Sequence, residues 1–223
     1  MTRLSDSSYN LRWDDANIPI KLRGLGLDVY EPSHASGIKA LQAAEDFVDH
    51  FGSHYVSPGR AKAGKLPEDR SRIGRGFLYT GVNGSRKTSL ACAILTEVQY
   101  LHHGLKIFYI RFSDWKRYLT NTFTNEQTEL VMKSREMLSK ADQAHLLVLD
   151  DIGQEHRTST GFTEKELHEF LRVRYEAARP TIVTSNIPVE FMVDTYGESF
   201  DSFRHDAFET FEFLGKDSRK IGK

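Results

Sequence analysis

Apolar positions along the chain change their spacing repeatedly after residue 76. Short apolar runs alternate with longer segments in which apolar residues recur every three or four positions, the spacing of one helix face. The runs predict strands at 76–80, 106–111, 145–150, 180–185 and 208–213. The longer segments predict helices at 36–52, 87–103, 113–140 (with a break near "TNTFTN") and 163–177, then short helices to about 206. Strands separated by helices predict an α/β fold with a parallel sheet covered on both faces.

The pattern divides the chain into two parts. Residues 1–35 are mixed and turn-rich, which predicts an N-terminal arm lying on a body, and residues 36–223 form the body. Within the body, the stretch 57–76 holds six basic and two acidic residues, a net charge of +4. We interpret it as a solvated loop, with contact to a phosphate backbone as the alternative.

Composition narrows the class of protein. The chain has 223 residues, of which 39% are hydrophobic and 27% charged, values typical of a soluble globular domain. The net charge of −1 gives no global attraction to nucleic acid or membrane. The single cysteine, Cys92, cannot form an internal disulfide, which favours a reducing compartment. No run approaches the roughly 18 apolar residues of a membrane span, and no apolar signal region opens the chain. We expect a cytoplasmic protein without membrane contact.

The segment "TGVNGSRKTSL" (80–90) lies between the first predicted strand and a helix. A glycine-containing turn in that position can aim backbone N–H groups at phosphate oxygens, and the helix N-terminus favours negative charge. Lys87 would reach the outer phosphates, and the Thr88 hydroxyl would bind Mg²⁺. A Gly-Asn-Gly turn that merely precedes Lys-Thr is the alternative. The predicted nucleotide-binding residues of this loop are Gly81, Val82, Asn83, Gly84, Ser85, Arg86, Lys87, Thr88 and Ser89.

Two further strand ends strengthen the nucleotide interpretation. The run "LLVLDDIG" (146–153) ends in Asp150 and Asp151, at the sheet edge where open parallel sheets bind ligands. There one carboxylate can hold the metal and its neighbour can orient or deprotonate the attacking water; a helix cap is the alternative. In "PTIVTSNIP" (180–188), Asn186 or Ser185 at the strand end can position that water. A phosphate loop paired with an acidic strand end is much rarer by chance than either alone.

The runs that carry these residues, with "RYEAARPTIVTSN" and the closing "FEFLGKDSR", resemble the AAA+ module of bacterial replicative helicase loaders of the DnaC/DnaI type and their phage relatives. "DDIG" followed by "TIVTSN" is shared with the IstB-type transposase helper ATPases. The similarity covers roughly 17–220. It implies an AAA+ P-loop NTPase with sheet order 5-1-4-3-2 that binds ATP or ADP with Mg²⁺. It also implies assembly into a spiral or ring, single-stranded DNA inside it, and a hexameric helicase as partner.

The resemblance also assigns roles to residues. It makes Asp150 the magnesium aspartate, with Thr88, and puts Asp151 where AAA+ proteins have the catalytic acid, usually glutamate. Asn186 matches the first sensor, and Arg219 the second-sensor arginine.

Two positions depart from the family pattern. Arg86 replaces the glycine before the lysine, and a positive φ there would cost on the order of 1–2 kcal/mol. In "FDSFRHD" (200–206), Ser202 stands where the family has an arginine that acts on the neighbouring subunit's ATP. Arg204, two residues on, is the candidate replacement. Such arginines contribute ~10³-fold or more to hydrolysis. We therefore expect nucleotide binding with at most weak hydrolysis.

The segment 112–140 corresponds to the family's DNA-contacting helices. Basic side chains interleaved with aromatic ones suit single-stranded DNA; an amphipathic helix pair with aromatics in the core is the alternative. The candidates are Arg111, Lys116, Arg117, Lys133 and Arg135, with Phe112, Trp115, Tyr118 and Phe123 between them. In the arm, Trp13, Ile18 and Ile20 could contact the helicase or pack on the protein's own core.

Three functions follow from these residues. The first is a helicase loader in DNA replication. The second is an IstB-like transposition helper that binds duplex DNA. The third is an adaptor or inhibitor of the helicase that has lost hydrolysis.

Overall fold

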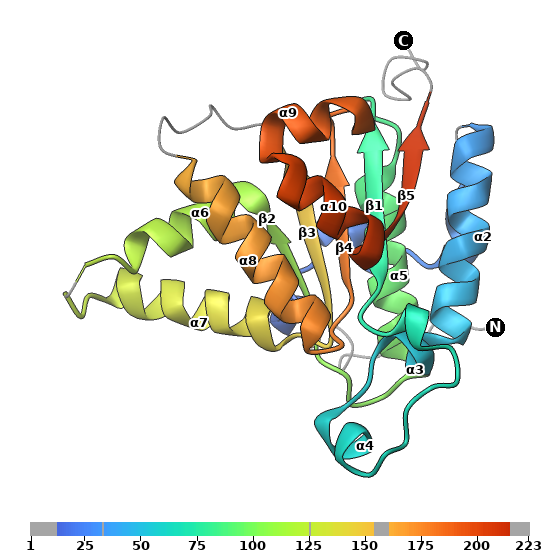
Figure 1. The fold of residues 1–223 in the computed structure, drawn as a ribbon, viewed down its shortest axis with the longest axis horizontal. Coiled ribbons are helices and arrows are strands. Elements are labelled where there is room, and N and C mark those ends of the chain that lie inside the picture. Colours follow the sequence, from blue (N-terminus) through green and yellow to red (C-terminus); the bar gives the residue numbers. More distant parts are fainter. Residues whose placement is uncertain (1–12, 33, 125, 154–160, 215–223) are drawn as a thin grey trace.

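The computed structural model describes residues 13–32, 34–124, 126–153 and 161–214. Its centre is a parallel sheet of five strands in the order β2-β3-β4-β1-β5 (Figure 1). This is the predicted order 5-1-4-3-2 read from the other edge, so the AAA+ P-loop fold is confirmed. The strands are β1 (Gly76–Gly81), β2 (Ile107–Arg111), β3 (Leu146–Ile152), β4 (Thr181–Ser185) and β5 (Phe208–Phe213).

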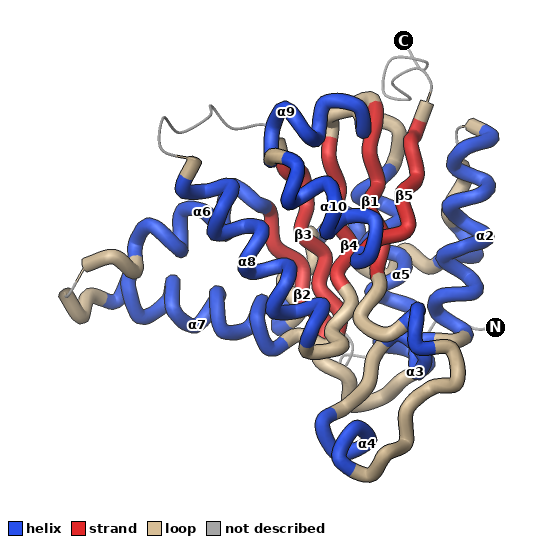
Figure 2. Tube along the Cα trace, viewed as in Figure 1, coloured by secondary structure: helices blue, strands red, loops and turns tan. Residues whose placement is uncertain are grey.

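Helices cover both faces of the sheet (Figure 2). They are α2 (Ala35–Asp49), α3 (Phe51–His54), α4 (Pro58–Lys62), α5 (Lys87–Leu101), α6 (Phe112–Asn121), α7 (Glu129–Gln143), α8 (Phe162–Glu176), α9 (Met192–Tyr196) and α10 (Glu198–Ala207). Alternate residues of each strand point to opposite faces. Phe77 and Val148 pack in one core with α2 and α5, whereas Leu78 and Leu147 pack in a second core with α8 and α10.

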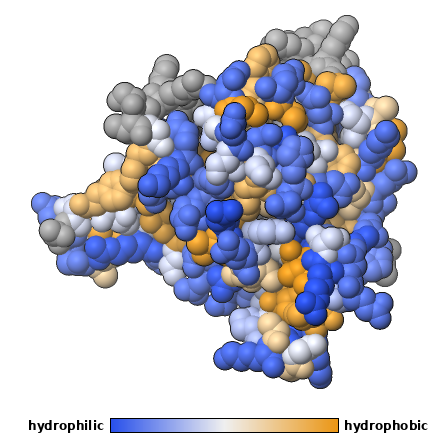
Figure 3. Space-filling model, viewed as in Figure 1, coloured by the Kyte–Doolittle hydropathy of each residue, from blue (hydrophilic) through white to orange (hydrophobic). Residues whose placement is uncertain are grey.

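Some predicted elements are divided. The helix expected at 36–52 ends at Asp49 and a short helix follows, while 113–140 forms the two helices α6 and α7. The stretch 57–76 contains α4 and a 3-10 turn at Arg70–Arg72 rather than loop alone. None of the helices in the described ranges is long and apolar enough to cross a bilayer. The face in Figure 3 is mostly hydrophilic, with scattered apolar patches.

Residues 13–32 pack on the body as part of its core. Ile18 is 1% exposed, and Leu27 and Tyr30 join the cluster that contains α5. Ile20 is the exception, at 79% exposed. Of the three apolar residues considered for helicase contact, Ile18 is therefore committed to the protein's own core, Trp13 packs partly against it, and Ile20 is free to meet a partner.

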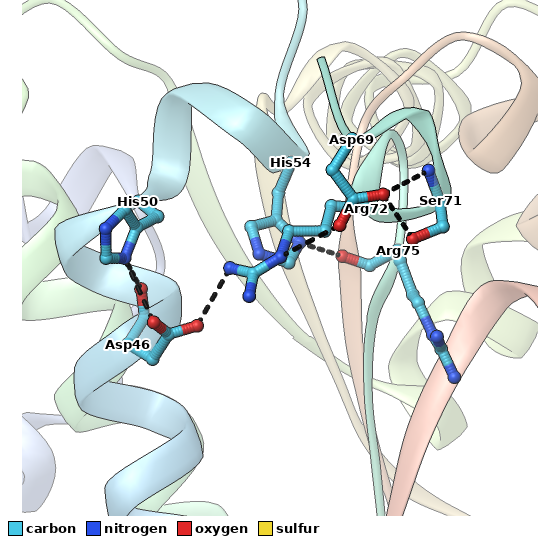
Figure 4. Close-up of polar contacts among 7 residues, drawn as sticks. All are labelled: Asp46, His50, His54, Asp69, Ser71, Arg72 and Arg75. Carbon is cyan, nitrogen blue, oxygen red and sulfur yellow. Dashed lines mark hydrogen bonds and ion pairs between the residues drawn. The ribbon is translucent and has the colours of Figure 1, made fainter. Parts of the chain in front are cut away.

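Part of the charge of 57–76 is used within the protein. Arg72 pairs with Asp46 of α2 at 2.9 Å and with Asp69 at 3.5 Å (Figure 4). The buried His54 hydrogen-bonds the carbonyl of Arg75 through Nδ1, at 3.0 Å. These contacts fasten the stretch to α2 and α3, beside the start of β1 and so away from the phosphate loop at that strand's other end.

Candidate functional site

The carboxyl ends of three adjacent strands, β1, β4 and β3, surround a cavity of about 510 Å³. Its wall consists of residues 83–89 from the loop after β1, Asp150 and Asp151 from β3, and Thr184 and Asn186 at the end of β4. Sequence positions separated by about 60 and 100 residues meet here because parallel strands present their carboxyl ends at one edge. Gly81 and Val82 lie outside this wall.

The loop from β1 into α5 is shaped around Lys87. Gly81 has φ +112°, and a Cβ there would lie 2.3 Å from the carbonyl oxygen of Phe213, so only glycine fits. Lys87 is 6% exposed, and its Nζ donates to the carbonyls of Gly81 and Val82 at 2.8 Å and to Asn186 Oδ1 at 3.0 Å. A buried ammonium at a helix N-terminus is suited to bind phosphate oxygens.

Arg86 adopts the backbone conformation that a glycine would normally supply. Its φ is +66°, in the left-handed region, which costs about 1–2 kcal/mol for a residue with a Cβ. The guanidinium donates to the Glu31 carbonyl at 3.0 Å and lies 3.7 Å from the Glu31 carboxylate. Among the described residues its hydrogen bond and ion pair are thus with the N-terminal segment, and neither aspartate is a partner in them.

Two substitutions at position 86 separate the backbone strain from the contacts with Glu31. Arg86→Gly removes the strain and the Glu31 contacts together, so its free energy of unfolding should stay within about 1 kcal/mol of wild type. Arg86→Ala loses the same contacts and keeps the strain, so it should be about 1 kcal/mol less stable than Arg86→Gly. Chemical denaturation of the three proteins measures both differences. Equal stabilities for the glycine and alanine variants would show that the backbone at position 86 is unstrained.

Asp150 is held by three hydroxyl groups. Thr88 Oγ1 and Thr184 Oγ1 both donate to Asp150 Oδ1 at 2.7 Å, and the Tyr109 hydroxyl donates to Oδ2 at 2.7 Å. The carboxylate is 6% exposed and has no cation among its described hydrogen-bond partners. Hydroxyl and carboxylate oxygens are the ligands that Mg²⁺ prefers, so Thr88 and Asp150 fit the predicted metal site.

A bulge in β3 brings both aspartates to the cavity. The register with β4 shifts between Leu149 and Ile152, and Asp151 has φ +67°. Consecutive strand residues would otherwise face opposite sides of the sheet. Asn186 Nδ2 donates to Asp151 Oδ1 at 2.5 Å. Burial, and then the charge of Asp150, raise the pKa of Asp151 above its usual range, while Lys87 acts in the opposite direction. A carboxylate of raised pKa held by an amide is suited to accept a proton from water.

The other predicted site residues lie elsewhere. Ser185 donates to the Ile152 carbonyl at 3.0 Å and joins β4 to β3 instead of facing the cavity. Arg204 is 6% exposed, and it pairs with Asp201 at 2.6 Å and donates to Thr210 at 3.3 Å. In this arrangement Arg204 stabilises its own subunit and is not presented to a neighbour. Arg219 lies outside the described residues.

The DNA candidates are spread over two regions. Lys116 and Arg117 lie on α6, and Lys133 and Arg135 lie on α7, in a helix pair that projects from the body (Figure 1). Arg117, Lys133 and Arg135 are exposed, whereas Lys116 is half-buried. Arg111 ends β2 opposite Asp150 in the register, beside the nucleotide cavity.

The aromatic residues of 112–124 also differ in how exposed their side chains are. Phe112 and Trp115 are buried in the core, so the core interpretation holds for these two. Tyr118 is half-buried, and Phe123 is 62% exposed with its ring against Phe162. Phe123 is therefore the aromatic side chain of 112–124 that a base could reach most readily.

Sequence reasoning missed two residues that contact Asp150. Thr184 lies one position before the predicted Ser185, and its hydroxyl also accepts the Asp151 N–H at 2.9 Å. Tyr109 lies in the apolar run of β2, and that position predicts a core residue. The signal for Thr184 is a polar residue inside the apolar run "TIVTS", whereas Tyr109 has no sequence signal.

Comparisons with solved structures agree with this fold. Among solved structures, the DnaC helicase loader matches with a TM-score of 0.65 and 21% identity over 88% of this chain and 100% of that one. DnaI matches with a TM-score of 0.61 and 19% identity over 90% and 93%. The replication initiator DnaA bound to AMPPCP and single-stranded DNA gives 0.61 and 14% over 86% and 50%. At these identities the likeness is one of fold.

A search of curated proteins found no match. Residues 75–200, more than half of the chain, match the family described as IstB-like ATP binding protein. These residues contain the loop, both aspartates and Asn186. The chain belongs to the IstB-like ATP-binding protein family.

Proposed function

We propose that this protein is an ATP-binding helicase loader that helps to place a hexameric replicative helicase on single-stranded DNA. The proposal that the protein binds ATP rests on one observation. Five residues suited to bind a nucleotide and its metal line one cavity: Lys87, Thr88, Asp150, Asp151 and Asn186. The loader part is supported by the structural match to the DnaC helicase loader over all of that chain. The family match names only ATP binding, so an IstB-like transposition helper remains the second candidate.

Each residue of the site would have a defined task. Lys87 and the loop N–H groups would hold the phosphates, Thr88 and Asp150 would hold Mg²⁺, and Asp151 with Asn186 would position water. When bound, Mg²⁺ would neutralise charge on the phosphate oxygens. We propose weak hydrolysis, because Arg204 is occupied within its own subunit. Nucleotide would then serve mainly to set the geometry of a homo-oligomeric spiral or ring.

We place single-stranded DNA along the α6–α7 helix pair. The exposed cations there can follow a phosphate backbone, and the exposed Phe123 ring offers a stacking surface. Arg111 is better placed to act at the nucleotide site, since its positive charge lowers the pKa of Asp151.

DNA preference and helicase capture test this function. With Mg-ATP, the protein should bind labelled single-stranded oligonucleotide more tightly than duplex of equal length, by fluorescence anisotropy, and should copurify with the hexameric replicative helicase of its source. Lys116→Glu with Arg117→Glu should weaken single-strand binding and reduce the salt slope by about 1–2.

Lys62→Glu with Lys65→Glu, on the basic stretch 57–76, is the matched control and should bind like wild type. A stronger loss in this control pair would transfer the DNA contact to that stretch. Preference for duplex together with no helicase capture would favour the transposition helper over the loader.

A further inference from the structure

The structure assigns Tyr109 as a positioning residue for Asp150, one that fixes the carboxylate for metal-dependent nucleotide binding. The inference rests on the proposed nucleotide site. It concerns a residue on β2, a strand that contributes no residue to the cavity wall. Its role would be exerted through Asp150.

The hydrogen bonds around Asp150 give Tyr109 a distinct position. Thr88 and Thr184 both donate to Oδ1, whereas Tyr109 donates to Oδ2. Without Tyr109, only Oδ1 would be held, and the carboxylate could rotate about its Cβ–Cγ bond. A hydroxyl on the second oxygen removes that freedom and leaves Oδ1 beside Thr88, its partner in the proposed metal site.

Tyr109 is itself held rigidly. The side chain is 3% exposed, and the strand register places the residue opposite Val148 of β3. On the outer edge of β2, its N–H donates to the Ala16 carbonyl at 2.8 Å and its carbonyl accepts from Asn17 Nδ2 at 2.9 Å. The N-terminal segment thus holds the backbone of Tyr109 in place, and the Tyr109 side chain in turn holds Asp150.

A purely structural role would not require the hydroxyl. Phenylalanine would fill the same space in an apolar run, and burying a phenol without a partner is costly. Tyr79 of β1 shows the contrast: it is 0% exposed, and its hydroxyl has no hydrogen-bond partner in the described part of the chain. The two tyrosines lie in the same core of the same sheet and differ in whether the hydroxyl meets a carboxylate.

Tyr109→Phe and the matched control Tyr79→Phe test the inference. The Mg²⁺ dependence of binding is measured with a fluorescent methylanthraniloyl derivative of ATP, from EDTA to saturating Mg²⁺, and thermal unfolding verifies that each variant is folded. Tyr109→Phe should raise the Mg²⁺ concentration for half-maximal binding about tenfold. It should leave affinity in EDTA unchanged, and Tyr79→Phe should match wild type throughout.

The outcomes separate this inference from the proposed function. If Tyr109→Phe shows the Mg²⁺ dependence of wild type, or loses affinity equally with and without Mg²⁺, the positioning role is wrong while the nucleotide site stands. If wild type binds nucleotide without any Mg²⁺ dependence, the positioning role is likewise wrong. If wild type binds no nucleotide at any Mg²⁺ concentration, both proposals fail.

Discussion

Replacing Lys87 with alanine is expected to lower nucleotide affinity about 100-fold, since a buried ammonium that holds two phosphate oxygens contributes about 3 kcal/mol. Lys87 is 6% exposed and points into the loop, where its Nζ already lies among oxygen acceptors at 2.8–3.3 Å. Alanine leaves the fold of the sheet intact but removes the buried cation of the loop wall, and the other cation of that wall, Arg86, is held at Glu31.

Isothermal titration calorimetry with ATP and Mg²⁺ measures this loss. Lys62→Ala, an exposed lysine of α4, is the control and should bind like wild type. Thermal unfolding of Lys87→Ala shows whether the loss is local. Wild-type affinity in a folded Lys87→Ala protein would mean that the nucleotide phosphates are held somewhere other than this loop.

The second large effect is on stability. Arg174→Met should reduce the free energy of unfolding by about 3–5 kcal/mol. Arg174 is 0% exposed and donates to the Thr181 hydroxyl and to backbone carbonyls at the end of α7 and before β4. Methionine has similar length but leaves these carbonyls buried without donors. Burial lowers the pKa of Arg174 to about 9, so the guanidinium is still cationic at neutral pH.

Arg172→Met is the matched control on the same helix. Arg172 is exposed and lies 3.8 Å from Glu176, so its loss should change stability by less than about 0.5 kcal/mol. In thermal unfolding, Arg174→Met should melt roughly 10 °C below wild type, since each kcal/mol shifts a chain of this size by about 2–4 °C. If both variants melted at the same temperature, Arg174 could not be the link that joins α7, α8 and β4.

The sequence was sufficient to predict the strands of the sheet and most residues of the cavity wall. Strands of parallel sheets are short apolar runs, so their positions and the ligand-binding edge could be predicted, and with them Lys87, Thr88, Asp150 and Asn186. Asp150 lies near the end of β3 and Asn186 directly follows β4, whereas Lys87 and Thr88 begin α5 after the loop that follows β1. All four are therefore near the carboxyl ends of strands, where the spacing along the sequence indicates which side chains meet. The resemblance supplied the strand order, which periodicity alone does not contain.

Contacts between distant segments could not be predicted. Tyr109 meets Asp150 only because β2 pairs with β3 in one register, and Arg174 is buried only because α8 packs beside the end of α7. The direction in which a side chain points could not be predicted either. The guanidinium of Arg86 is held by Glu31, 55 positions away. Arg204 was the candidate replacement, two residues after the position of the family's arginine, yet Asp201 holds it within its own subunit.

The central claim is that the turn after β1 binds a triphosphate and its metal against Asp150 and Asp151, with Arg86 directed away. A crystal structure with a non-hydrolysable ATP analogue and Mg²⁺ tests it most directly. We expect the outer phosphates at Lys87 Nζ, the metal between Thr88 and Asp150, and the Arg86 guanidinium still at Glu31. A cavity filled by that guanidinium, or an analogue bound away from this edge of the sheet, would contradict the account.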